Sequence, residues 1–155
     1  MTVTKHAYPV VAVLLAAAVA NPMRAAAAGP FDISTRQTVD MPANVVQVLR
    51  GDMIDLLGNL QRAQTLSGEG KYFAAADLVD KTLGQSAMGR FGAGVRPSMF
   101  MPSAMQTLEQ DLHRSATDWS RALRSSDRKQ ADTALAKLIG QCLGCHQSFQ
   151  IRRMP

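Results

Sequence analysis

The feature that most constrains this chain is a cluster of three reactive side chains near its C-terminus. Cys142 and Cys145 are the only cysteines among the 155 residues, and His146 follows the second one directly. Residues three and four apart lie on one face of a helix, so both thiols and the imidazole would point the same way. This Cys-x-x-Cys-His spacing is typical of a c-type haem attachment site. It predicts one haem c held by two thioether bonds, with His146 as the proximal iron ligand.

Two other kinds of site use cysteines at this spacing. A thioredoxin-like redox centre would be accompanied by alternating strand and helix patterns, which this sequence lacks. A zinc site would need a fourth ligand, and only His113 or a carboxylate could provide it. Covalent haem therefore explains the motif better than either alternative.

The first 28 residues have the pattern of a secretory signal peptide. Lys5 and His6 precede an apolar run at residues 10–20, and three alanines at 26–28 offer an Ala-x-Ala cleavage site. The run is shorter than the roughly 20 residues that span a bilayer. An uncleaved tail or membrane anchor is the alternative. Cleavage predicts a periplasmic protein, which agrees with the motif because bacteria attach c-type haem outside the cytoplasm.

The remaining residues, 29–155, have the size of one domain with one core. Residues 29–41 show no clear period, so we expect an extended or loosely packed N-terminal arm before a helical domain at 42–155. Loss of Lys5 and Arg24 would leave 15 basic and 12 acidic residues, a formal charge of +3. This mild charge does not favour nucleic-acid binding. It suits docking to acidic redox partner proteins.

Apolar residues at helical spacing predict four helices in this domain. The first two are expected at about 42–67 and 69–83, followed by a long connection rich in glycine and proline at 84–102. No strand pattern competes. The fold class predicted is all-α, an antiparallel four-helix bundle with covalent haem on the C-terminal helix.

The third and fourth helices have start signals of their own. Ser103 is followed by Gln106 as in a capping box, and Asp127 is followed by Gln130 in the same way. The fourth helix would carry the Cys-x-x-Cys-His motif and run to two arginines at 152–153, which would complement the helix dipole. On the third helix we expect the single tryptophan, Trp119, in the core. We expect His113, one position away from the apolar stripe, to be partly exposed.

A Cys-x-x-Cys-His motif on the last helix of an exported four-helix domain resembles the class II c-type cytochromes, the cytochrome c prime family. In this resemblance Cys142 and Cys145 match the haem anchors and His146 the proximal ligand. Phe149 matches an aromatic residue that commonly follows the histidine by three positions. Arg50 resembles an arginine that family members often place near the haem propionates.

Gln150 departs from the family pattern, which often has lysine or arginine there, so proximal chemistry that needs this cation is not expected. The resemblance also implies a distal residue about one turn after Arg50. Met53 could bind the iron through its thioether, as in the low-spin branch of the family, whereas Ile54 would leave the iron five-coordinate. The two positions lie about 100° apart on a helix, so only one can face the iron. Ordinary core packing of Met53 is the plain alternative.

The function expected is a periplasmic electron carrier without enzymatic activity. The alternative is a five-coordinate haem protein that binds nitric oxide or carbon monoxide. A peroxidase is disfavoured because His113 and Arg114, neighbours on a helix, point different ways and cannot act as a distal pair. Family members often pair through their first helices, which implies a possible homodimer.

Overall fold

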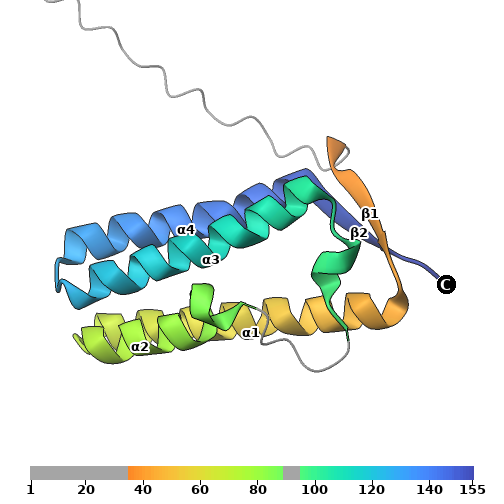
Figure 1. Cartoon of the computed structure of the whole chain (residues 1–155). Helices are drawn as coiled ribbons and strands as arrows, with labels where there is room; N and C mark the ends of the chain where they lie inside the picture. The colour runs from red at the N-terminus through yellow and green to blue at the C-terminus, as the bar shows by residue number, and fades with distance from the viewer. Residues whose placement is uncertain (1–34, 89–94) are drawn as a thin grey trace, which may run out of the picture. The chain divides into compact units, whose positions relative to one another are not determined.

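The computed structural model describes residues 35–88 and 95–155, all within the unit Phe31–Pro155. These residues are mostly helical, with four helices packed together as predicted: α1 (Ala43–Gly68), α2 (Tyr72–Thr82), α3 (Ser103–Arg124) and α4 (Arg128–Ser148) (Figure 1). The predicted signal peptide and the start of the arm, residues 29–34, lie outside the described residues. None of the described helices combines the length and apolarity needed to cross a membrane.

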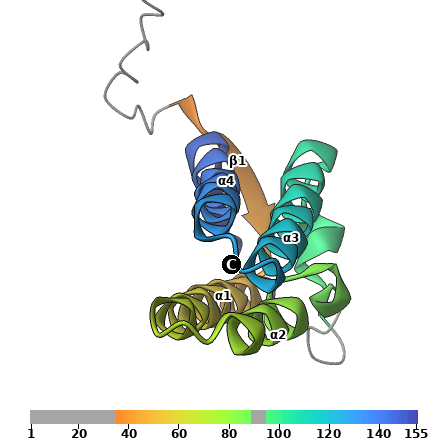
Figure 2. The same cartoon turned by 90° about the vertical axis from the view of Figure 1, so that its left-hand side faces the viewer.

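Some pairs of helices pack closely along their length, whereas others approach each other at only a few points. Figure 2 shows them nearly end on, with α2 beside α1 and α4 beside α3. α2 also packs against α3, whereas α1 and α4, which are described in full, come close at few points. The main core lies among all four helices and contains Trp119, which is 1% exposed as the sequence predicted. α1 is therefore packed mainly against α2 and approaches both α3 and α4 at few points.

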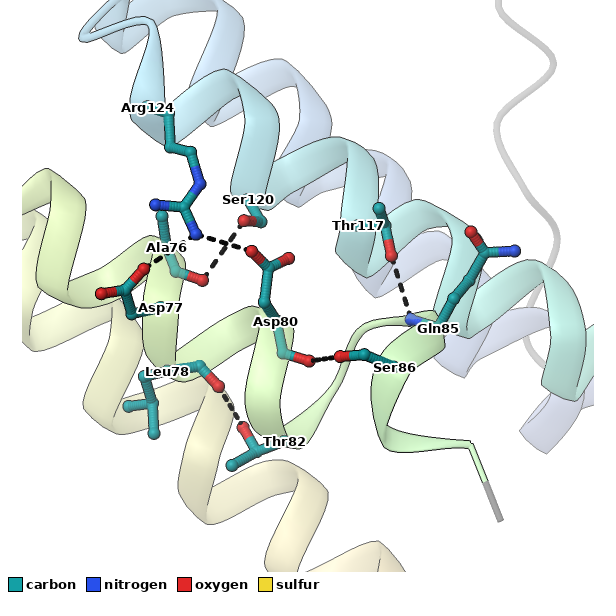
Figure 3. A network of polar contacts seen from close by, with 10 residues as sticks. All are labelled: Ala76, Asp77, Leu78, Asp80, Thr82, Gln85, Ser86, Thr117, Ser120 and Arg124. Atoms are coloured by element: carbon teal, nitrogen blue, oxygen red, sulfur yellow. Dashed lines mark hydrogen bonds and ion pairs between the residues drawn. The ribbon is translucent and has the colours of Figure 1, made fainter. Parts of the chain in front are cut away.

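Polar contacts fasten α2 to α3 (Figure 3). The buried Ser120 hydroxyl donates a hydrogen bond to the carbonyl of Ala76 at 3.2 Å. Nearby, the Arg124 guanidinium lies 2.8 Å from Asp77 and 2.7 Å from Asp80. Exposed ion pairs of this kind contribute little to stability. Their effect is to set the position of α2 along α3.

A two-stranded parallel sheet corrects two predictions. β1 (Gln37–Met41) lies in the arm predicted to be extended or loosely packed, where no strand was expected. It pairs with β2 (Phe149–Arg153), which was expected to continue the fourth helix. In this register Asp40 lies opposite Arg152, and the guanidinium donates two hydrogen bonds to the carboxylate, at 2.5 and 2.7 Å. Arg152 therefore serves a strand pair and not the helix dipole. Both strands are five residues long, and their apolar residues, Val39 and Met41 in β1 and Phe149 and Ile151 in β2, do alternate with polar ones. They lie in segments that were expected as an arm and a helix.

The sheet helps to build a second, smaller core. Val39 and Met41 of β1 and Phe149 of β2 are buried there with residues from the start of α1 and α3. Cys145 packs against the edge of this cluster. β1, in the described part of the arm, thus shares one apolar core with the end of the motif helix.

The helix starts agree only in part with the sequence signals. Asp127 caps α4 as predicted, because its side chain accepts a hydrogen bond from the Gln130 amide at 3.0 Å. The predicted capping box at Ser103 is wrong, since Pro102 occupies the cap position and Gln106 instead donates to the carbonyl of Met101 at 2.9 Å. α2 begins at Tyr72, slightly later than expected.

Candidate haem site

A cavity of about 1180 Å³ opens where α1 and α4 diverge. Its volume slightly exceeds the range of roughly 300–1,000 Å³ common for small-molecule sites. The walls come from α1, α3, α4 and β2, with η3 (Pro97–Phe100) at one side. The lining is mainly apolar. Besides Met53 it draws on both cores: Leu49, Leu56, Leu60, Leu83, Met101, Met105, Leu108, Leu112, Leu138 and Phe149. The site is thus large enough for a bulky, mostly apolar ligand.

All three motif residues line this cavity. Cys142, Cys145 and His146 lie in the last two turns of α4, which confirms that they share one face. Both cysteines are free thiols and half-buried, and the imidazole is exposed. No side chain in the described part of the chain hydrogen-bonds to His146. Both thiols and the imidazole are therefore available to a ligand in the cavity.

The pKa values of the two thiols disfavour a dithiol redox centre. Burial raises the pKa of the Cys142 thiol. Burial is also the main cause of the raised pKa of the Cys145 thiol, and the nearby Cys142 and Glu109 raise it further. Reactive dithiol centres depend instead on a lowered thiol pKa, because the thiolate is the nucleophile. The raised pKa values of both thiols therefore disfavour disulfide exchange.

The zinc alternative lacks its ligand set. Among the described residues, no three histidine, cysteine, aspartate or glutamate side chains converge closely enough to hold a metal ion. A structural zinc site needs four such ligands. The donor set that the cavity does offer, two thiols and one imidazole against apolar walls, fits a covalently attached haem.

Both candidates for the distal side line the cavity from α1. Met53 is 39% exposed and Ile54 is 71% exposed, so neither lies in the closed core. Packing of Met53 inside an ordinary core, the plain alternative, therefore does not describe its place in the structure. Arg50, one turn earlier, is exposed at the same cavity. The choice between thioether and open iron remains a prediction.

His113 corrects the sequence analysis. It is 3% exposed, not partly exposed, and it lines the cavity from α3. Its Nδ1 lies 2.7 Å from the carbonyl oxygen of Leu83. Leu83 is the residue at the C-terminal cap of α2. Because a carbonyl only accepts, Nδ1 carries the hydrogen in this contact. Its position off the stripe of α3 concealed this contact, which depends on where α2 ends.

Two carboxyl groups at the cavity were also missed. Glu109 on α3 and Asp52 on α1 both line it. Burial raises the pKa of both groups; the nearby Asp52 raises that of Glu109 further, and His113 lowers it. Neither residue belongs to a motif, so no sequence signal could have found them.

Comparisons with known proteins leave the family open. No protein-family model matches this chain, and no curated protein or solved structure matches it either. The resemblance to class II c-type cytochromes therefore stays a hypothesis that rests on the residues themselves.

Proposed function

We propose that this protein is a periplasmic c-type cytochrome of the cytochrome c prime type, which carries electrons through one haem c. Cys142 and Cys145 hold the haem by thioether bonds, and His146 binds its iron. The observation that supports this most is that these three residues line one large apolar cavity beside the gap between α1 and α4. The proposal includes an exported chain with a cleaved signal peptide, an antiparallel bundle and no enzymatic activity.

The bound haem would supply reversible one-electron chemistry at its iron. The chain's own residues control the surroundings of that iron. Apolar side chains of α1 and α3 exclude water, which strengthens electrostatic interactions inside the cavity. Arg50 is exposed at the cavity and suits the carboxylates of a porphyrin edge. The partner would be another redox protein, approached through a weakly basic surface.

A five-coordinate haem protein that binds nitric oxide or carbon monoxide is the second candidate. It is favoured by one observation, namely that Ile54 lines the cavity next to Met53 and offers the iron no donor atom. Methionine ligation favours electron transfer because the iron keeps a similar coordination in both oxidation states. An open apolar face favours small neutral gases.

Optical spectra of the purified protein in both redox states, with and without carbon monoxide, test these proposals together. If Met53 binds the iron, the reduced protein shows sharp low-spin bands, and Met53→Ala converts them to high-spin bands that respond to carbon monoxide. Met99→Ala is the matched control, because Met99 is 78% exposed and does not line the cavity. If the iron is open, the wild type is already high-spin and Met53→Ala leaves it so.

Covalent attachment has its own test. Acid acetone should leave the pigment on the wild-type chain and remove it from a variant with both Cys142→Ala and Cys145→Ala. A colourless exported protein, or pigment that extracts from the wild type, would refute the proposed function. Sedimentation at several concentrations tests the homodimer.

A further inference from the structure

Glu109 is a carboxyl group in an otherwise mostly apolar cavity. It lies on α3, is half-buried, and faces the same space as Cys142, Cys145 and His146. In the described part of the chain no cation forms an ion pair with it and no donor hydrogen-bonds to it. A carboxylate left without a partner in such a place is costly, so the protonated form gains in stability.

Charged and titratable groups face this cavity from each element around it. α1 contributes Arg50 and Asp52, α3 contributes His113, and α4 contributes the motif residues. Arg96, directly before η3, and Arg36, directly before β1, also line the cavity. Arg50 is exposed to solvent, which screens its charge.

The balance of these groups favours protonation of Glu109. Burial is the largest cause of its raised pKa; His113 opposes the shift, and the Asp52 carboxylate across the cavity adds to it. The carboxyl group therefore titrates closer to neutral pH than an exposed glutamate does. Because Glu109 faces the same cavity as the motif residues, a change of charge in that cavity changes its protonation equilibrium.

We propose that Glu109 couples electron transfer at the haem to uptake and release of one proton. This deepens the proposed function and rests on it. Ferric haem carries one more positive charge than ferrous haem, and that charge stabilises the Glu109 carboxylate across a cavity of low polarity. On oxidation, the electron passes to the redox partner protein and the proton leaves the Glu109 oxygen for water. On reduction both return, and only the O–H bond is made or broken in the chain.

The midpoint potential as a function of pH tests this coupling. It should fall as the pH rises between the pKa values of Glu109 in the ferrous and ferric protein. One proton per electron gives a slope of at most about 59 mV per pH unit, since each unit is a tenfold change. Outside that window the potential should be constant.

Glu109→Gln is nearly isosteric and neutral at every pH, so its potential should stay at the low-pH value without a slope. Glu69→Gln is the matched control. Glu69 is exposed beyond the end of α1, pairs with Lys71 at 2.8 Å and does not line the cavity, so this variant should keep the slope. A Glu109→Gln protein that keeps the slope, or a Glu69→Gln protein that loses it, overturns the proposal.

Infrared difference spectra of the wild type provide a measurement that needs no variant. Reduction should produce the carbonyl band of a protonated carboxyl group, and oxidation should remove it. A wild type whose haem cycles reversibly at a pH-independent potential, without this band, overturns the coupling and leaves the electron carrier intact. A protein without reducible haem refutes the proposed function itself.

Discussion

Met41 tests whether the N-terminal arm is a structural part of the domain. The residue is 0% exposed and lies in the second core beside Phe149 and the start of α1. Met41→Ala removes three buried heavy atoms, worth roughly 2 kcal/mol of transfer free energy at about 0.8 kcal/mol per group. The remaining cavity adds to this, so the free energy of unfolding should fall by about 2–5 kcal/mol.

Urea unfolding followed by far-ultraviolet circular dichroism measures this loss. The midpoint should drop while the slope with denaturant stays constant, because the same surface is exposed on unfolding. Met99→Ala is the matched control, since Met99 is 78% exposed and should change stability by about 0.5 kcal/mol or less. Met41→Leu, which conserves volume, should cost less than about 1.5 kcal/mol.

Equal effects of Met41→Ala and Met99→Ala would refute the reasoning, because the arm would then contribute no core. The loss should also reach the motif helix, as Cys145 packs at the edge of the same cluster. Hydrogen exchange at the end of α4 should accelerate in Met41→Ala and remain unchanged in Met99→Ala.

Three further predictions concern single contacts. Asp127→Ala removes the α4 cap and should cost about 1 kcal/mol in urea unfolding, whereas Ser103→Ala, at a position without a capping bond, should cost clearly less. His113→Phe leaves the carbonyl at the end of α2 without its donor and should cost about 1–3 kcal/mol; an unchanged midpoint would contradict this. The hydrogen bond from Arg152 lowers the pKa of Asp40, so their pair should stabilise the fold at neutral pH and lose this effect as acid protonates Asp40. Arg152→Ala should abolish that part of the acid dependence, and an unchanged acid titration would contradict the pairing.

Local patterns determined much of what could be read from the sequence alone. The three motif residues share a face because α-helix geometry places positions three and four apart together, whatever the rest of the chain does. The cap at Asp127 involves an amide three residues away, so its signal was also local. Trp119 was placed correctly because it belongs to an apolar stripe within one helix.

Contacts between distant segments were decided only by the tertiary structure. Asp40 and Arg152 are separated by 112 positions, and no property of either short strand predicts that they pair. The burial of His113 depends on where α2 ends, and the surroundings of Glu109 depend on how far α1 lies from α4. Spacing along one helix determines which side chains share a face, whereas packing between helices decides which faces enclose a cavity.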